Sequence, residues 1–176
     1  MAEDDNNPQP AAAAEGAAQA QGPQFGVQRL YLKDSSFESP RSPSVFQSQW
    51  SPKINFDLKT RSNKIQDGVY EVVLVVTAEA LTDDSEAAFL IEVHQAGIFT
   101  VKDFDDAETE RILATVCPNI LFPYARETID SLVVKGSFPA LMLSPLNFDA
   151  LYEQNKQQKA AGGADGTEPP APEITQ

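Results

Sequence analysis

The side chains best suited to chemistry in this sequence are its single cysteine, Cys117, and its single histidine, His94. A thiol and an imidazole form a nucleophile and its general base when the fold brings them within hydrogen-bond distance. Nothing in the flanking sequence supports such a pair, so we favour a buried cysteine at a helix boundary and a surface histidine on a strand. One residue of each type also excludes a Cys/His metal site, and one cysteine excludes an internal disulfide, which fits a reducing compartment.

An acidic run, DFDDAETE at 103–110, resembles a calcium-binding loop in composition. Ala107 stands at its third odd position and Glu108 where glycine is required, so the run lacks the ligand pattern of such a loop. Asp105 followed three residues later by Glu108 instead fits a capping box at a helix start. The sequence contains no glycine-rich phosphate loop, nucleophile elbow or kinase signature. We therefore expect no cofactor, no metal and no enzymatic activity.

Charge and hydropathy narrow the remaining function classes. The formal net charge is −13, and residues 27–155 alone hold 19 acidic against 11 basic side chains. A folded region with this excess of negative charge repels phosphate backbones and anionic lipid surfaces, which argues against a nucleic-acid or membrane partner. No apolar run approaches the roughly 20 residues that span a bilayer, and AAAAEGAAQA is too weakly apolar for a secretory signal. We expect a soluble, cytoplasmic protein without direct membrane insertion.

Composition divides the chain into three parts. Residues 1–24 are rich in Ala, Gln and Pro and are expected to form a disordered N-terminal extension. Residues 25–155 contain nearly all the large apolar side chains and form the expected folded domain. Residues 156–176 are a Gly/Pro/acidic segment and are expected to be a flexible C-terminal tail.

Four stretches of the folded part have strand character: 25–33, 53–60, 69–80 and 87–99. The second alternates strictly, with Ile54, Phe56 and Leu58 on one face. The third is apolar on both faces in its middle, so we expect a helix or another subunit to cover its second face. A proline-rich connection, 34–52, joins the first two strands, and Asp67 with Gly68 marks a turn after the second.

The hydrophobic period then changes to that of a helix. Apolar residues recur every fourth position from 121 to 133, and Gly136 beyond them is a natural C-terminal stop. Pro118 suits a first helical turn, whereas Pro123 lies inside and costs about 3 kcal/mol there. We expect these prolines to set the start and bend of the helix so that Tyr124 faces a groove. Residues 144–155 predict a second helix, so the fold class is α+β: a four-stranded antiparallel sheet with two main helices on one side.

Apolar side chains are also concentrated in two loops. Phe46 and Trp50 lie in the proline-rich connection, and FPALML follows the long helix at 138–143. Taken singly, an apolar residue in such a loop more often covers the hydrophobic core than contacts a ligand. Together, two apolar loops beside an apolar helix indicate an apolar groove on the surface that binds a partner.

Four stretches resemble the SecB family of protein-export chaperones. They are YLKDSSFESPRSPSVFQSQWSP, VYEVVLVVTAEA, FLIEVHQAGIF and CPNILFPYARETIDSLVVKGSFPALMLSPLNFDALY. The resemblance covers about residues 25–153 and implies a SecB-like fold that assembles as a dimer of dimers, a homotetramer. It also implies a cytosolic chaperone that binds unfolded precursor proteins in apolar grooves, keeps them export-competent and delivers them to the SecA translocation ATPase.

The resemblance carries over two sets of residues by position. The SecA-binding set is Asp34, Glu38, Leu90 and Glu92, on an acidic sheet surface. The client-groove set, where a client is an unfolded protein held by the chaperone, is Trp50, Phe89, Tyr124, Phe138, Leu141 and Leu143.

Two other functions stay open. One is a small-ligand enzyme that uses Cys117 and His94. The other is an adaptor that joins folded proteins through its acidic sheet and ignores denatured ones.

Overall fold

The computed structural model of the chain describes residues 22–82 and 86–161. The expectations for the terminal segments, 1–24 and 156–176, therefore fall largely outside the described residues. The strands are β1 (Gln24–Glu38), β2 (Lys53–Gln66), β3 (Val69–Leu81) and β4 (Ala87–Lys102). The helices are the 3₁₀ turn η1 (Ser44–Gln47), α1 (Asp106–Arg111), the π-helical turn η2 (Ile112–Val116), α2 (Cys117–Lys135) and α3 (Phe148–Ala161).

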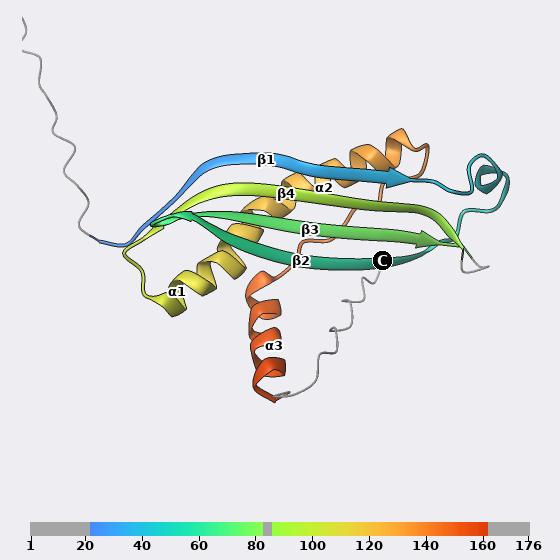
Figure 1. The fold of residues 1–176 in the computed structure, drawn as a ribbon. Coiled ribbons are helices and arrows are strands. Elements are labelled where there is room, and N and C mark those ends of the chain that lie inside the picture. Colours follow the sequence, from blue (N-terminus) through green and yellow to red (C-terminus); the bar gives the residue numbers. More distant parts are fainter. Residues whose placement is uncertain (1–21, 83–85, 162–176) are drawn as a thin grey trace, which may run out of the picture.

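The four strands form one antiparallel sheet in the order β1-β4-β3-β2 (Figure 1). Asp67 and Gly68 connect β2 to β3 as a tight hairpin, which confirms the turn predicted there. Gly68 has a φ of +65°, and a Cβ atom at this position would meet the side chain of Lys102. Glycine is therefore favoured here by its backbone conformation, and a larger residue would also have to displace the flexible Lys102 side chain.

Both edge strands are longer than their apolar patterns predict. β1 continues to Glu38 and β2 to Gln66, whereas sequence periodicity ended them at residues 33 and 60. The added residues are mostly polar and exposed, because an edge strand needs only one neighbour for its backbone hydrogen bonds. Strand pairing rather than burial of side chains sets the length of these strands.

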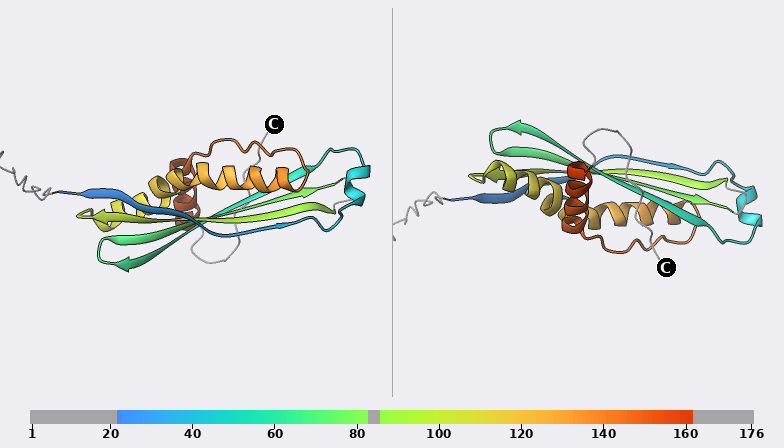
Figure 2. Two further views of the ribbon diagram at one scale, coloured as in Figure 1. Left: turned by 90° about the horizontal axis from the view of Figure 1, so that it is seen from above. Right: turned by 90° about the horizontal axis from the view of Figure 1, so that it is seen from below.

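The inner face of the sheet, which is the face toward α2, holds the main core. Leu74 on β3 and Ile91 on β4 are fully buried there with Leu121 and Ile129 of α2. Burial of one such side chain stabilises the fold by about 1.5–3 kcal/mol. Figure 2 shows α2 running along this one side of the sheet, which confirms the predicted layering.

The outer face of the sheet, which is the face away from α2, has a small apolar patch of its own. Val73 and Val75 of β3 are buried there against Ala96, with Tyr31 of β1 packed beside them. Side chains of neighbouring strands thus bury the second face of β3. Helix α2 lies on the other face, so the expectation of a helix as the cover of this face was wrong, and cover by another subunit stays a prediction.

The helical region begins at the predicted capping box. The Asp105 carboxylate accepts a hydrogen bond from the Glu108 backbone N–H at 2.7 Å. The helix then passes through the π-helical turn η2, which ends at Val116, two residues before Pro118. A wider turn suits this position, since proline has no N–H to donate and crowds the preceding turn.

Helix α2 buries the predicted stripe of Leu121, Ala125, Ile129 and Val133, and it ends at Gly136 as expected. Pro123 lies inside the helix on its exposed side. Residues 137–147, named here the post-helix segment, connect α2 to α3, which packs against η2. Helix α3 continues through Ala161 into the segment that begins at residue 156. No helix within residues 22–82 and 86–161 has the length and apolar character needed to cross a bilayer.

Candidate functional site

Five aromatic rings meet where the sheet, the connection between β1 and β2, and the post-helix segment come together. Phe138 is at the centre of this group, which we name the aromatic cluster. The distances from the centroid of its ring to those of its neighbours are 5.0 Å to Phe89, 5.1 Å to Trp50, 5.2 Å to Phe46 and 6.3 Å to Phe37.

Four parts of the fold supply the rings of the aromatic cluster. Phe37 lies near the end of β1 and Phe89 near the start of β4, while Phe46 and Trp50 lie in residues 39–52, the crossover. Phe138 follows α2 directly, and its N–H donates to the Val133 carbonyl at 3.1 Å. Gly136 allows this close packing, because a Cβ atom there would lie 2.3 Å from the Phe37 ring.

The aromatic cluster is buried on the side of the sheet, and only its outer rings, on the crossover, reach solvent. Phe89 and Phe138 are 0 % and 5 % exposed, whereas Phe46 is 49 % exposed and Trp50 is half-buried. The crossover therefore forms the cover of the cluster, and its two rings separate the inner rings from solvent.

Polar side chains of α2 hold the post-helix segment in place. The Asp130 carboxylate accepts hydrogen bonds from the backbone N–H groups of Leu141 at 3.1 Å and Met142 at 3.2 Å. The Arg126 guanidinium donates to the Leu143 carbonyl at 3.3 Å. These bonds hold the post-helix segment against α2, and Leu143 is buried and Leu141 half-buried.

The structure brings most of the predicted client-groove residues together. Trp50, Phe89 and Phe138 belong to the aromatic cluster, and Leu141 and Leu143 pack in the same core as Phe138. Tyr124 is half-exposed on α2, and no ring contact joins it to the cluster within the described residues. In the single chain these residues form a closed cluster rather than an open trough.

Sequence reasoning missed Phe37 as a member of the aromatic cluster and had Phe46 only as a loop residue. Phe37 lies in the part of β1 that was assigned to the proline-rich connection. Its place opposite Ile91, in the register of β1 with β4, is the signal that identifies it as inward-facing.

Two hollows on the surface of the described residues are lined by other side chains. One of about 790 Å³ lies between β2, α1 and α3, with Leu58, Arg111 and Tyr152 in its wall. A shallower one of about 580 Å³ lies on the exposed side of α2, beside Pro123, Asp130 and Val134. The client-groove set predicted from the sequence lines neither of these hollows.

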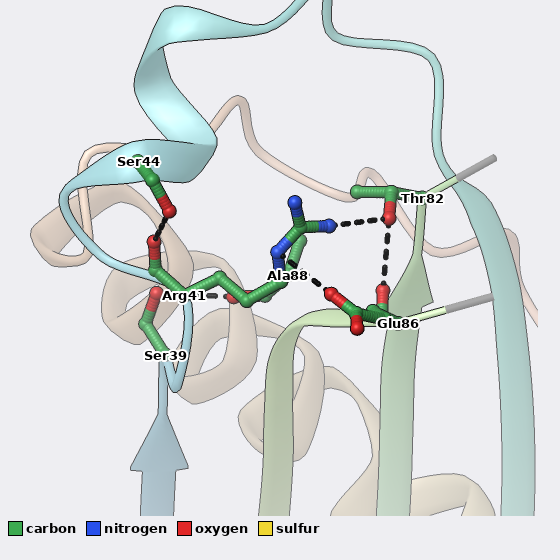
Figure 3. Close-up of polar contacts among 6 residues, drawn as sticks. All are labelled: Ser39, Arg41, Ser44, Thr82, Glu86 and Ala88. Atoms are coloured by element: carbon green, nitrogen blue, oxygen red, sulfur yellow. Dashed lines mark hydrogen bonds and ion pairs between the residues drawn. The ribbon is translucent and has the colours of Figure 1, made fainter. Parts of the chain in front are cut away.

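The crossover is tied to the ends of β3 and β4 by a group of polar contacts (Figure 3). The Arg41 guanidinium donates to the Thr82 hydroxyl at 2.8 Å and forms an ion pair of 3.1 Å with Glu86. Ser39 donates to the Ala88 carbonyl at 3.0 Å. These contacts place the start of the crossover next to Phe89.

The predicted SecA-binding residues all lie on the outer face of the sheet. Glu38 is paired with Leu90 across β1 and β4, and Asp34 is paired with His94. Residues paired in this way project to the same face, and Glu92 lies between Leu90 and His94 in the alternation of β4. The four residues therefore share one face, and their role in binding SecA stays a prediction.

Glu92 is held in a defined position by its neighbours. Its carboxylate accepts hydrogen bonds from His94 at 2.7 Å and from the Thr77 hydroxyl at 3.3 Å. The hydrogen bond from His94 lowers the pKa of Glu92 below its usual value. The group is thus ionised under neutral conditions and aimed outward.

Two further acids extend this surface beyond the residues that the sequence singled out. Glu79 is paired with Leu90 on the other side of β4, and Asp57 is paired with Thr77. The alternation of β2, with Ile54, Phe56 and Leu58 on one face, places Asp57 on the opposite face. Only the strand order shows that its face is the one that carries Glu92.

A second polar group lies further along the outer face. The Glu71 carboxylate accepts hydrogen bonds from the Lys33 ammonium at 2.7 Å and from the Tyr31 hydroxyl. Lys33 and then Tyr31 lower the pKa of Glu71, and the hydrogen bond to Glu71 with burial raises the pKa of Tyr31 to about 12.

Cys117 and His94 lie on opposite faces of the sheet. Cys117 is fully buried in the core beneath the inner face, and burial raises the pKa of its thiol to about 12. His94 projects from the outer face beside Glu92. The fold therefore does not form the nucleophile and base considered from the sequence. Within the described part of the chain, no cluster of three or more Cys, His, Asp or Glu side chains is arranged to hold a metal.

Comparison with known proteins identifies close relatives. The family model described as preprotein translocase subunit SecB matches residues 18–159. The protein-export protein SecB of Pseudomonas aeruginosa (strain LESB58) is 51 % identical over 162 residues, which cover 92 % of this chain and 97 % of the relative. The protein of the same name from Pseudomonas syringae pv. tomato is 50 % identical and covers 90 % and 93 %.

A solved structure has the same fold. It is that of a Mycobacterium tuberculosis SecB-like chaperone in complex with a ChAD peptide from an antitoxin. The TM-score is 0.56 at 17 % identity, and the match covers 70 % of this chain and 91 % of that one.

Proposed function

Because the chain belongs to the SecB family of protein-export chaperones, we propose that it binds unfolded precursor proteins, keeps them export-competent and delivers them to the SecA ATPase. The observation that carries this proposal is the family match over residues 18–159. That range includes every ring of the aromatic cluster and every acid of the outer face.

Client binding uses the aromatic cluster and the post-helix segment. Burial of apolar client surface yields roughly 25 cal/mol per Å², so a few aromatic or aliphatic side chains per site are sufficient for micromolar contact. The exposed ring of Phe46 and the exposed side chain of Met142 offer first contacts on the two sides of the cluster. Deeper binding needs access to Phe89 and Phe138. Selection of clients is kinetic, since a folded protein offers few such segments.

Delivery uses the outer face of the sheet. Glu38, Glu79 and Glu92 surround Leu90 there, which gives an apolar centre with an acidic rim. Opposite charges steer association at long range, while the apolar centre supplies contact energy. A SecA partner with a basic patch fits this surface. The protein acts by binding alone and not as an enzyme, and it acts in the cytoplasm.

We also propose assembly as a homotetramer, a dimer of dimers. Phe25, Val27 and Leu32 are exposed on the edge strand β1, and Tyr124 and Val134 are exposed on α2. Apolar side chains on a free sheet edge and on a helix surface are the kind that a second copy buries. Four grooves on one particle bind a long client with much higher avidity than one groove does.

The experiment is aggregation of a reduced, unfolded protein followed by light scattering, without ATP. A chaperone that holds unfolded proteins suppresses the light scattering from aggregates at about one tetramer per client molecule. The alternative is an adaptor that joins folded proteins through the acidic outer face. It would bind SecA and leave the scattering unchanged, so the two functions are separated by one assay.

A further inference from the structure

We propose that Arg41 is a positioning residue that latches the crossover over the aromatic cluster and thereby sets the affinity for clients. The inference rests on the proposed client binding, and it names the contact that controls access to that site. The crossover covers the rings of Phe89 and Phe138, so the contacts that hold the crossover on the sheet control access to these rings.

The side chain of Arg41 reaches out of the crossover to the ends of β3 and β4. Its Nη1 donates to the Thr82 hydroxyl at 2.8 Å, and its Nε lies 3.1 Å from the Glu86 carboxylate (Figure 3). Thr82 in turn donates to the Glu86 carbonyl at 3.1 Å. The guanidinium thus binds two groups that are themselves joined, which gives the crossover a firm attachment point on the sheet.

The backbone of Arg41 organises the turn that follows it. Its carbonyl accepts hydrogen bonds from the Val45 N–H at 3.0 Å and from the Ser44 hydroxyl at 2.7 Å. This turn leads directly to Phe46, and Val45 is buried beneath it. Movement of Arg41 relative to the sheet would therefore move Phe46 with it.

The latched crossover supplies two of the four ring neighbours of Phe138. The rings of Phe46 and Trp50 lie 5.2 Å and 5.1 Å from it, and Trp50 also stacks on Phe89 at 6.3 Å. If the crossover lifts, Phe138 and Phe89 lose this cover, and both become available to apolar side chains of a client.

The strength of the latch suits a reversible cover. The Arg41 side chain is 27 % exposed and that of Glu86 is 63 % exposed, so water and salt screen the ion pair. A weakly held closed state leaves a minor open population. A client that binds only the open state then has an apparent affinity reduced by the fraction of open molecules.

A latch and a structural support at Arg41 have effects of opposite sign on client affinity. Removal of the latch raises the open fraction, so Arg41→Ala should bind clients about two- to tenfold more tightly than wild type. A residue that merely supports a preformed groove would have the opposite effect, because a disordered crossover weakens binding.

The experiment measures two quantities in parallel on the full chain. Acrylamide quenching of Trp50, the single tryptophan of the chain, reports exposure of the crossover without any client. Fluorescence anisotropy of a labelled, reduced and carboxymethylated protein that stays unfolded reports client affinity. Arg111→Ala is the matched control, since it removes a pair of the same 3.1 Å length, to Asp149, away from the crossover.

The latch predicts stronger Trp50 quenching and tighter client binding in Arg41→Ala, and wild-type values in Arg111→Ala. The exchange Arg41→Glu with Glu86→Arg restores the ion pair with reversed polarity, and it should return both readouts toward wild type. Raised salt should increase quenching in wild type but not in Arg41→Ala.

Unchanged or weaker client binding in a folded Arg41→Ala, with wild type binding normally, would overturn the latch alone. Absence of client binding in wild type would instead contradict the proposed function and remove the basis of the latch with it. A urea unfolding curve for each variant establishes that it is folded.

Discussion

Trp50 and Phe138 lie in ring contact, 5.1 Å between centroids, although 88 residues separate them in the chain. The contact joins the crossover to the post-helix segment and closes the aromatic cluster over Phe89. We propose that this cluster is also the binding surface for unfolded chains. On this account the same rings stabilise the free protein and contact the client when the crossover opens.

Phe138→Ala tests the double role of the central ring. We expect the free energy of unfolding to fall by about 3–5 kcal/mol, because a buried phenylalanine leaves a cavity when it is truncated. Phe46→Ala should cost about 1 kcal/mol or less, since half of its surface is already exposed. Urea unfolding at one fixed protein concentration measures both. Equal costs would mean that Phe138 is not the centre of the cluster.

Positive charge introduced on the outer face tests the proposed SecA-binding surface. Glu92→Lys and Leu90→Arg should each weaken SecA binding about tenfold, because each disrupts the centre of the acidic surface. Client binding should stay unchanged, since the aromatic cluster lies on the other side of the sheet. Titration calorimetry at two salt concentrations gives the affinity and its electrostatic part.

Glu110→Lys is the control for this change of charge, because Glu110 is exposed on α1 and not on the sheet. It should leave the affinity for SecA within about twofold. A loss equal to that of Glu92→Lys would indicate that total charge, and not the outer face, governs the interaction.

The raised pKa of Tyr31 makes the stability of the folded protein depend on pH above 10. Its pKa is raised to about 12 by the hydrogen bond to Glu71 and by burial, so the folded protein favours the neutral phenol. The stabilisation is complete below pH 10, the value for an unfolded tyrosine, and is lost as the pH rises from 10 to about 12.

Ultraviolet titration of phenolate should show one of the four tyrosines ionising near pH 12. Tyr31→Phe should remove this phase and flatten the loss of stability between pH 10 and 12. Persistence of the late phase in Tyr31→Phe would assign it to a different tyrosine.

Cys117 should be unreactive in the native protein. Burial raises its pKa to about 12, so only roughly one thiol in ten thousand is ionised at pH 8. A colorimetric disulfide reagent should therefore react with it only as fast as the protein unfolds, and immediately in denaturant. Fast reaction of the folded protein would restore the possibility of a nucleophile at this position.

Hydrophobic periodicity and capping patterns predicted those parts of the fold that are determined by residues close together in the sequence. The alternation of Ile54, Phe56 and Leu58, the cap at Asp105 and the stop at Gly136 all require only local geometry. Helix and sheet patterns also predicted which face of α2 is buried.

The remaining features depend on contacts between distant segments. Phe37 joins the aromatic cluster because β1 extends beyond its apolar pattern and pairs with β4. Tyr31 buries Val73 and Val75 across an intervening strand, which no pattern within β3 reveals. Likewise, the contact of Arg41 with Thr82 and Glu86 follows from the path of the crossover, and prolines alone do not specify that path.

The most direct measurement is light scattering of a reduced, unfolded protein during dilution from denaturant, without ATP and with increasing amounts of this chain. We predict that scattering is suppressed fully near one tetramer per client and that added SecA then binds the complex. Aggregation that proceeds at the same rate with and without the chain would contradict the account, because apolar rings that never meet an unfolded protein would be core residues only.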